Sequence, residues 1–510
     1  MLERVPPCPT DLHDLEVLIR SHHPLILLET EEDERARTLV RWVADHLDMP
    51  FACYRPDSGL VRPDRSSFAL EGSEDPLVCL DHILKGKGET LYGETLYFLE
   101  GMGPKLAGEQ GDTIAHKLVQ VAHKLFDHRG AVLLPERGVE LPPQLERMAT
   151  VLQLSAPTRE QYHDLVKRVL RDLRARMTVE VKLSGEEVAQ LVEQLHGLTF
   201  FEVKKVLTKV IVEDGDISAD DIPKLAEAKK AIIERSGVLE YFSAEETMKR
   251  VAGLSQLKAW LGKRKLAFTE PLRAQEFGLT PPRGILLLGV QGCGKSLCAK
   301  AIASEWGLPL IRLDPSNLYN KFFGESEKNL KRATRTAEEM APIVLWIDEL
   351  EKAFAQGGDQ DSGTSSRIFG TFLSWMQEKQ DGVFVVATSN DITRLPPELM
   401  RKGRFDEIFF VDLPDAQVRS EILALHLSRR GRDPSGLDLS ELSRRMEGFS
   451  GAEIEQVVVS GLYTAFAARE DLTLRHLLEE IERTVPLSVT AAEKIEQLRG
   501  WAKNRAVAAD

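Results

Sequence analysis

The chain has 510 residues, of which 43% are hydrophobic and 29% are charged, the composition of an ordinary globular protein with about three to four compact units. A net charge of −14 weighs against generic nucleic-acid binding, and five cysteines without a C-x-x-C pair fit neither a disulfide framework nor a zinc site. No apolar run approaches the roughly 18 residues of a membrane span, and the first residues lack the layout of a signal peptide, so we expect no membrane span and a cytoplasmic protein.

The first 240 residues contain short apolar runs that are typical of the strands of an α/β domain. The runs lie at residues 25–28, 96–99 and 132–134, and their length favours buried strands over helices. The segment after the first run, residues 29–34, holds five acids and neither glycine nor lysine. A loop of this charge repels other anions.

Residues 285–296 combine another apolar run with the spacing G-x-x-x-x-G-K-S. Glycines let successive backbone N–H groups surround a phosphate without Cβ clashes, at the start of the helix expected near Lys295. In this pattern Lys295 reaches the β- and γ-phosphates, and the Ser296 hydroxyl binds Mg²⁺. The segment therefore predicts a nucleoside triphosphatase that uses ATP and Mg²⁺. The alternative is a glycine-rich turn between an ordinary strand and helix.

The residues that we assign to nucleotide contact in this loop are Gly289, Gln291, Gly292, Cys293, Gly294, Lys295, Ser296 and Leu297. Cys293 is the one reactive residue type among them. A thiol with a lowered pKa is conceivable beside a phosphate site, but we interpret Cys293 as a small space-filling residue.

A predicted strand at residues 343–347 ends in two acids, Asp348 and Glu349. These acids should lie at the C-terminal edge of a parallel sheet, where the ligands of such sheets bind. We assign Asp348 to the metal, together with Ser296, and Glu349 to polarising the attacking water. The alternative is a pair of solvated acids that cap the next helix. A third buried run leads to Asn390, whose side chain could hydrogen-bond the γ-phosphate or the attacking water.

Residues 395–406, which follow Asn390, complete a set of motifs that resembles the AAA+ ATPases. The match is with the AAA subgroup shared with membrane proteases, katanin-like severing enzymes and the cell-division-cycle segregases, and it covers about residues 245–470. The resemblance implies an α/β P-loop core, with a parallel sheet flanked by helices, followed by a helical lid. It also implies a homo-oligomeric ring, usually a hexamer, in which Arg401 and Arg404 are arginine fingers that reach the neighbour's active site.

Further residues match the nucleotide contacts of the same subgroup. His426 lies where the subgroup has a ribose-side histidine, and Gly451 with Ala452 lies where its backbone passes the adenine. Ala252 and Gly253 match the family's other adenine-contacting segment. The sequence departs from many relatives at residues 291–293, where Pro-x-Thr is common, but the glycines and the lysine are intact. We therefore expect activity to survive.

A more extended likeness includes residues 363–379 and 486–489. These segments resemble the hypothetical-chloroplast-reading-frame AAA proteins of red-algal plastids, cyanobacteria and other bacteria. The likeness identifies a group of proteins and adds little mechanism.

Five landmarks of the first half correspond to landmarks of the second half at separations of 248 to 260 residues. The pairs begin at residues 25 and 285, 96 and 344, 132 and 384, 141 and 395, and 197 and 448. Near-constant separations favour tandem copies of one α/β-plus-lid module. Two unrelated α/β folds with a similar strand rhythm are the alternative.

If the copies are related, the first has lost its chemistry and is a degenerate AAA-like α/β domain. The acids of residues 29–34 replace the phosphate loop, Glu100 lacks a preceding aspartate, and the rings of Phe200 and Phe201 are expected to fill the base pocket. We expect this copy to act in recruitment, ring stabilisation or regulation. The expected boundaries are 1–170 for the degenerate domain, 171–240 for its helical lid and connector, 241–412 for the ATPase core, and 413–510 for the second lid and a polar helical tail.

AAA rings commonly pull a polymer through a central pore, and the gripping loop of the family follows the second strand of the core. Here that position holds Lys321, Phe322, Phe323 and Gly324, with Phe322 suited to apolar contact with varied peptide side chains. The alternative is that the two rings are core residues. Residues 356–366, rich in glycine and aspartate, are expected to line the pore as a second loop.

These observations favour an ATP-driven motor that remodels an unidentified protein client. The chain contains no H-E-x-x-H sequence, which excludes the protease version of the family. A nucleic-acid motor would need a basic groove that the sequence does not supply, so we expect no nucleic-acid partner. A nucleotide-dependent scaffold, in which slow hydrolysis only switches ring assembly, is the other alternative.

Overall fold

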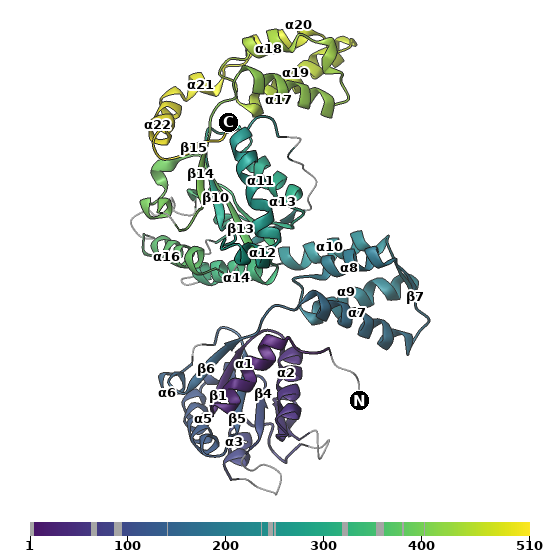
Figure 1. Ribbon diagram of the computed structural model, residues 1–510, viewed down its shortest axis with the longest axis vertical. Helices are drawn as coiled ribbons and strands as arrows, with labels where there is room; N and C mark the ends of the chain where they lie inside the picture. The colour runs from purple at the N-terminus through teal and green to yellow at the C-terminus, as the bar shows by residue number, and fades with distance from the viewer. Residues whose placement is uncertain are drawn as a thin grey trace. The chain divides into compact units, whose positions relative to one another are not determined.

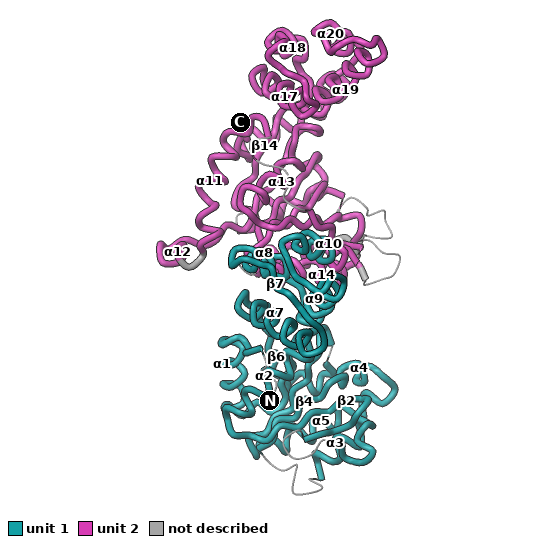
Figure 2. Tube along the Cα trace, turned by 90° about the vertical axis from the view of Figure 1, so that its right-hand side faces the viewer, with its two compact units in different colours: residues 1–229 teal, residues 230–510 magenta. Residues whose placement is uncertain are grey.

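The computed structural model describes residues 5–62, 69–85, 94–139, 141–235, 237–242, 248, 251–318, 325–352, 362–379, 382–401 and 403–510. The chain divides into two compact units, residues 1–229 and residues 230–510 (Figure 2). Each unit has its own α/β sheet and its own group of helices after the sheet.

The sheet of the first unit has the strand order β3-β2-β4-β5-β1-β6. All neighbours pair in parallel except β3, which is antiparallel to β2 at the edge. In the centre, Leu25 of β1 lies opposite Val132 on one side and Ala149 on the other. The strands are β1 (Leu25–Glu29), β2 (Phe51–Arg55), β3 (Gly59–Val61), β4 (Leu96–Leu99), β5 (Ala131–Glu136) and β6 (Ala149–Gln153).

Both faces of this sheet are covered by helices, which explains why its central strands β1, β4 and β5 are buried and apolar over most of their length. Successive side chains of β1 alternate between the faces: Leu25 and Leu27 pack with α3 and α5, whereas Ile26 and Leu28 pack with α1 and α2. Figure 1 shows these helices around the first sheet. The helices are α1 (Pro9–Arg20), α2 (Asp33–His46), α3 (Pro76–Lys85), α4 (Gly103–Leu106), α5 (Gly111–Phe126) and α6 (Pro143–Glu146).

A group of helices follows the first sheet. The elements are α7 (Arg159–Arg174), β7 (Glu180–Lys182), α8 (Gly185–Leu195), α9 (Phe200–Asp214), β8 (Asp216–Ser218) and α10 (Asp221–Glu234). Capping boxes at Thr158, Ser184 and Thr199 begin α7, α8 and α9, because each side chain accepts a hydrogen bond from an otherwise unpaired backbone N–H. The start of each of these helices is therefore determined by residues that are close together in the sequence.

The sheet of the second unit has the strand order β15-β14-β10-β13-β12-β11-β9. Its five central strands are parallel, with β9 antiparallel to β11 at one edge and β15 parallel to β14 at the other. The strands are β9 (Leu239–Phe242), β10 (Gly284–Gly289), β11 (Leu310–Leu313), β12 (Ile343–Ile347), β13 (Val383–Ser389), β14 (Glu407–Val411) and β15 (Val507–Ala508).

The two sheets share one topology. When the five parallel strands of each unit are numbered along the chain, both sheets have the order 5-1-4-3-2, and both carry an antiparallel strand beside strand 2. Such agreement supports tandem copies over two unrelated α/β folds. The prediction of an AAA-type α/β core preceded by a related α/β domain is confirmed.

The second sheet is also covered on both faces. Ile285 and Leu287 of β10 pack with α11 and α13, whereas Leu286 and Leu288 pack with α14 and α16. The helical elements of this layer are α11 (Ser255–Thr269), α12 (Pro271–Glu276), α13 (Lys295–Trp306), η2 (Pro315–Leu318), α14 (Glu325–Glu339), α16 (Ser362–Glu378), η3 (Ile392–Arg394) and η4 (Pro397–Met400).

A helical lid follows β14, with its own core around Leu423, Ile454 and Leu477. Its elements are α17 (Ala416–Arg429), η5 (Pro434–Gly436), α18 (Leu439–Arg445), α19 (Gly451–Ala468) and α20 (Leu474–Arg483), and α21 (Leu487–Thr490) and α22 (Ala492–Ala502) come next. In the described ranges, none of the helices is both long and apolar enough to cross a membrane.

The segment after the lid differs from the expected polar helical tail. Leu498 of α22 is buried in the core of the large subdomain, Arg499 forms a bidentate ion pair with Asp412 at 2.8 and 2.9 Å, and β15 extends the sheet beside β14. The expected helical connector also differs, because β9 follows α10 and pairs with β11. In both places a few apolar residues within a polar segment pack or pair with residues that are distant in sequence.

Candidate nucleotide site

A cavity of about 460 Å³ lies at the carboxyl edge of the second sheet, between that edge and the lid. It is lined by most of the residues that the sequence assigned to the nucleotide: Ala252, Gln291, Gly292, Cys293, Gly294, Lys295, Ser296, Leu297, Asp348, Glu349, Asn390, His426, Gly451 and Ala452. Segments that are up to about 200 residues apart in the chain are thus brought to one place. Gly253 and Gly289 are not part of the lining: Gly253 lies between the lining residues Ala252 and Leu254, and Gly289 lies two residues before Gln291.

The phosphate loop, residues 289–296, connects β10 to α13. A Cβ atom at Gly289 would lie 2.0 Å from the carbonyl oxygen of Val411, so only glycine lets β10 and β14 pair where the loop begins. Gly294, with φ of +85°, stands directly before the first residue of α13. Glycine adopts this left-handed conformation without the strain that a side chain would add.

Lys295 is buried at the start of α13, and within the described residues its ammonium group forms hydrogen bonds to backbone carbonyl groups rather than to a carboxylate. Its Nζ donates to the carbonyl oxygens of Gly289 and Val290 at 2.9 and 2.8 Å. Burial lowers the pKa of Lys295 to about 8, because desolvation penalises the charged form. A phosphate oxygen at this position would offset that penalty and favour the charged lysine.

The oxygen atoms of Ser296, Asp348 and Thr388 form one cluster. The Ser296 hydroxyl donates to Asp348 Oδ1 at 3.2 Å, and the Thr388 hydroxyl donates to the same oxygen at 2.7 Å. Thr388 also accepts from the backbone N–H of Glu349 at 3.0 Å. A hydroxyl and a carboxylate side by side are the hard oxygen donors that Mg²⁺ prefers beside substrate phosphates, so the residues fit this ion.

Glu349 and Asn390 lie on neighbouring strand ends, with Asn390 Nδ2 at 3.4 Å from Glu349 Oε1. The buried Glu351 holds the backbone of Asn390, because its carboxylate accepts a hydrogen bond from the N–H of Asn390 at 3.0 Å. Glu349 has a φ of +50°, a left-handed conformation that costs a non-glycine residue about 1–2 kcal/mol. Such strain is found where function requires a side chain in an unusual direction. Lys352 forms an ion pair with Glu349.

The lid contributes to the cavity through α17 and α19. The backbone N–H of Ala452, in the first turn of α19, donates to the carbonyl oxygen of Gly292 in the phosphate loop at 3.0 Å. His426 on α17 lies with Nδ1 3.5 Å from Glu455. Burial lowers the pKa of His426 and outweighs the opposite effect of the Glu455 carboxylate, so the imidazole is neutral at neutral pH and can accept or donate one hydrogen bond.

The segment expected on the adenine side is held by a residue that the sequence did not indicate. The carboxylate of Asp510 accepts hydrogen bonds from the backbone N–H groups of Leu254 and Ser255 at the start of α11. A Cβ atom at Gly253 would lie 2.8 Å from Asp510 Oδ1. Asp510 also lines the cavity, so the segment after the lid helps to shape the site.

Two further residues were not assigned from the sequence. Thr388 links Asp348 to Glu349. The sequence could have indicated it, since Thr388 lies near the end of a buried apolar run, as the two acids do. Asp510 has no such signal, because it is more than 250 residues from Leu254. Contacts at that separation depend on the whole fold.

The two arginines assigned as fingers have different environments. Arg401 is exposed, whereas Arg404 is 8% exposed and its guanidinium donates to the carbonyl oxygen of Glu398 in the same chain. In this conformation Arg401 is the better placed of the two to contact another subunit. The residues predicted to form the first pore loop, Lys321, Phe322, Phe323 and Gly324, and residues 356–361 of the predicted second loop lie outside the described residues.

Cys293 lies in the phosphate loop with its pKa raised to about 11 by burial. The group is therefore a neutral thiol at neutral pH, which favours the space-filling interpretation over the reactive one. In the part of the chain that the structure describes, no group of three or more His, Cys, Asp or Glu side chains could hold a metal ion. A zinc-type site is thus not found there.

The loop of the first unit that corresponds to the phosphate loop follows β1. Glu32 Oε1 accepts from the backbone N–H of Phe200, at the start of α9, at 2.6 Å, and Glu32 Oε2 lies 3.2 Å from the buried guanidinium of Arg35. Phe200 is buried, with its ring centroid 6.2 Å from that of Tyr162, but Phe201 is 74% exposed. The expectation that both rings fill a base pocket is wrong for Phe201.

Three family models match the chain. The model described as the ATPase family associated with various cellular activities (AAA) matches residues 285–413. The N-terminal and second domains of a SpoVK-like AAA ATPase match residues 11–154 and 160–236. The first unit is therefore related to domains that accompany AAA ATPases.

Known proteins from algae and archaea are similar to the chain. A protein of Pyropia yezoensis, described as the uncharacterized AAA domain-containing protein ycf46, is 35% identical over 96% of the chain and 97% of its own length. The cell division cycle protein 48 homolog of Archaeoglobus fulgidus is 27% identical over 78% of the chain and 60% of its own length. The proteasome-activating nucleotidase of Aeropyrum pernix is 34% identical over 43% of the chain and 54% of its own length.

Proposed function

The chain belongs to the ycf46 family of AAA domain-containing proteins, and on that premise we propose that it is an Mg²⁺-dependent ATPase whose ring assembly remodels a protein client. One observation carries the proposal. A buried lysine, a hydroxyl, two acids and an amide from three separate segments surround a single cavity under a helical lid.

The arrangement suggests a division of labour in hydrolysis. The charged Lys295 binds the β- and γ-phosphates, while Ser296 and Asp348 hold the metal, which neutralises charge on those phosphates. Glu349 polarises the attacking water, with Asn390 as the neighbouring hydrogen-bond donor. Thr388 is a positioning residue, because its hydroxyl holds the Asp348 carboxylate and the Glu349 backbone together.

Ring assembly is supported by the exposed guanidinium of Arg401. In a ring this group completes the neighbour's site, and a positive charge supplied in trans accelerates comparable phosphoryl transfers by about 10³ or more. We assign this role first to Arg401, and to Arg404 only if its side chain leaves the contact with Glu398. The ring is homo-oligomeric, with a hexamer as the expected form.

The protein client is supported by two relatives, a proteasome-activating nucleotidase and a cell division cycle protein 48 homolog. The residues of the first pore loop add a sequence argument, since Phe322 is suited to apolar contact with varied peptides. No basic groove for nucleic acid was indicated by the sequence, and the net charge of −14 opposes one.

A stimulation experiment tests this function. The ATPase rate is measured across protein concentrations, alone and with unfolded protein or DNA. The expected rate rises with protein concentration, rises further with unfolded protein, and falls about a thousandfold in Arg401→Ala. A concentration-independent rate would contradict the ring, and stimulation by DNA alone or by neither polymer would contradict the protein client.

A variant pair separates remodelling from ring formation. Phe322→Ala should keep basal hydrolysis within a few-fold of wild type and lose stimulation by unfolded protein, whereas Phe466→Ala, an exposed ring on the lid, is the matched surface control. Retention of full stimulation by Phe322→Ala would argue for a scaffold in which hydrolysis only switches assembly.

A further inference from the structure

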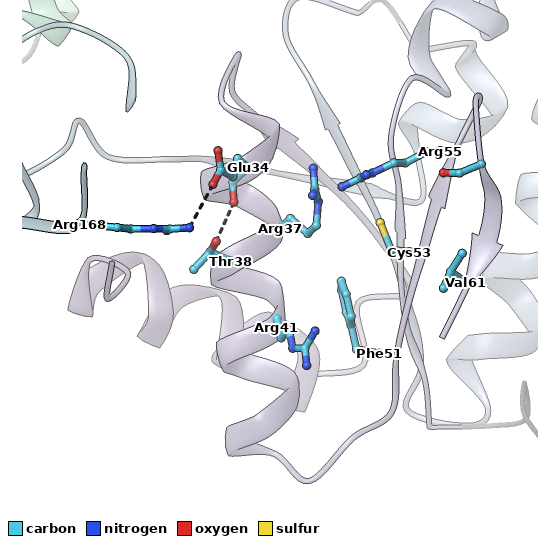
Figure 3. A pocket seen from close by; sticks show the side chains of 10 residues that line it. Glu34, Arg37, Thr38, Arg41, Phe51, Cys53, Arg55, Val61 and Arg168 are labelled. Atoms are coloured by element: carbon cyan, nitrogen blue, oxygen red, sulfur yellow. Dashed lines mark hydrogen bonds and ion pairs between the residues drawn. The ribbon is translucent and has the colours of Figure 1, made fainter. Parts of the chain in front are cut away.

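The first unit contains a cavity of about 330 Å³ that is separate from the nucleotide site of the second unit. Side chains from α2, β2 and α7 surround it, and Figure 3 shows guanidinium groups on both sides of the space between α2 and β2. Four of the lining residues are arginines: Arg37, Arg41, Arg55 and Arg168. The cavity is thus basic in a chain whose net charge is −14.

The nearby acids leave this positive charge incompletely compensated. Glu34 is the one acid among the described lining residues, and it already binds Lys204 at 2.6 Å with Arg168 at 3.8 Å. Arg37 and Arg55 share a single carboxylate, that of Glu100, at 2.6 and 3.1 Å. Two guanidinium groups on one carboxylate retain unused N–H donors.

Arg41 has the clearest capacity for a ligand. Its guanidinium has neither a hydrogen bond nor an ion pair with any residue that the structure describes, and it is only partly exposed. A half-buried cation without a partner is unfavourable. An anion in the cavity would supply the missing partner and use the donors left on Arg37 and Arg55.

The remaining wall of the cavity is apolar. Phe51 and Cys53 of β2 are 6% and 8% exposed, and Val61 of β3 lies beside them. Burial raises the pKa of Cys53 to about 11, so this thiol adds no negative charge at neutral pH. Basic groups on one side and apolar groups on the other suit a small organic anion better than a bare ion.

We propose that this cavity binds a small phosphorylated molecule, with Arg37, Arg41 and Arg55 holding the phosphate group. The planar donor fork of arginine matches phosphate oxygens, and a dianion satisfies more of the unused donors than a single carboxylate does. The volume lies at the lower end of small-molecule sites and suits a sugar phosphate rather than a nucleoside triphosphate. The site is independent of the proposed ATPase function.

The ligand would also join two parts of the first unit. Arg168 belongs to α7 of the helical part, whereas Arg37 and Arg41 belong to α2 of the α/β part. A ligand that fills the cavity reaches Arg168 as well as the three arginines that hold its phosphate, so binding stabilises the packing of the two parts and should raise the midpoint temperature of thermal unfolding.

The test uses the full chain with Lys295→Ala, which removes the phosphate-binding lysine of the second unit. Binding of ribose 5-phosphate, inorganic phosphate and citrate is measured by calorimetry and thermal shift in phosphate-free buffer. Arg41→Gln is the variant, because Arg41 supports no described contact and its loss should not unfold the unit. Arg20→Gln is the control, since Arg20 is exposed on α1 and pairs only with Glu16 among the described contacts.

We expect saturable binding of a phosphate probe that weakens about tenfold or more in Arg41→Gln and in Arg37→Gln and is unchanged in Arg20→Gln. The tighter of the two phosphate probes identifies the source of the phosphate group, an ester or the free ion. Binding of citrate alone, binding of no probe at millimolar concentration, or equal binding by Arg41→Gln and Arg20→Gln would overturn the proposal.

Discussion

The two units carry the same five-strand order, yet the loop that follows the first strand is built with opposite charge in each. In the second unit, backbone groups and the buried Lys295 surround a cavity that can receive an anion. In the first unit the chain supplies the anion itself, because Glu32 binds the start of the helix α9 and the guanidinium of Arg35. The loop contacts the first turn of the lid helix directly in both units, but in the first unit a carboxylate of the chain makes that contact, whereas in the second unit the phosphate loop borders a cavity.

This difference teaches which contacts preserve the fold and which preserve the chemistry. The alternating apolar side chains of β1 and β10 keep both sheets covered on both faces. The two sheets depend mainly on these apolar side chains, so a copy whose loop holds acids in place of glycine and lysine still forms the same sheet. A carboxylate near a helix N-terminus and an arginine is itself a stabilising arrangement.

The largest expected effect concerns the acids at the strand ends. Glu349→Gln should bind ATP normally and turn over about 10²–10⁴ times more slowly, because a general base is lost while the phosphate contacts remain. Glu100→Gln, at the corresponding place in the first unit, should leave the turnover of the second unit unchanged. Steady-state ATPase rates and nucleotide affinity measured together check both statements. Equal loss of affinity and rate in Glu349→Gln would show that the division of roles is wrong.

A second effect concerns the internal anion of the first unit. Glu32→Ala should lower the free energy of unfolding of that unit by about 2–3 kcal/mol, because it leaves a buried N–H and part of the Arg35 charge unpaired. Glu31→Ala is the matched control, since Glu31 is more than half exposed and its ion pair with Arg137 should contribute less than about 1 kcal/mol. Urea unfolding followed by separate probes for each unit measures the difference. Equal effects of the two substitutions would remove the proposed role of Glu32.

A third effect is a pH dependence of the affinity for ATP, which we expect at the site of the second unit. Without nucleotide, burial holds the pKa of Lys295 at about 8, and the bound phosphates should raise it. Above pH 8 the free protein has therefore lost a proton that the complex retains, so binding takes up a proton and affinity should fall by up to about tenfold per pH unit. Calorimetry in buffers of different ionisation enthalpy measures the uptake. An affinity for ATP that stays constant between pH 7.5 and 9.5 would contradict this account.

The same proton balance predicts how pH affects stability without nucleotide. A lysine whose folded pKa is below its unfolded value binds fewer protons when folded, so its unfavourable contribution is fully present below pH 8. That contribution is relieved as the pH rises from about 8 toward the unfolded value of 10.5. The nucleotide-free second unit should gain stability over that interval from this group.

Much of the site followed from local sequence patterns. The phosphate loop, Asp348 and Glu349 were predictable because each stands directly at the end of a short apolar strand, and strand ends of a parallel sheet meet at one edge. The repeat was predictable from the spacing of its landmarks, and the shared strand order of the two sheets supports it.

Other features could not be predicted because they depend on contacts between distant segments. The Asp510 carboxylate at the start of α11, the strand β15 beside β14, and the Glu32 contact with Phe200 each join residues more than 90 positions apart. A side chain such as Phe201 also shows how a pattern misleads, since adjacent aromatic residues on a helix point in different directions. The burial of Arg404 arises from the turn that contains Glu398 rather than from its motif.

The most direct test of the account is the number of ATP molecules bound per chain. Calorimetry with the Glu349→Gln protein, which should retain nucleotide without turnover, measures this number in the presence of Mg²⁺. The account predicts saturation at no more than one ATP per chain. This binding should be lost in the Lys295→Ala, Glu349→Gln double variant. Arg35→Ala in the Glu349→Gln background should leave ATP binding by the second unit intact. Two ATP molecules per chain, or tight binding that persists without Lys295, would contradict the claim that only the second unit is built to receive a nucleotide.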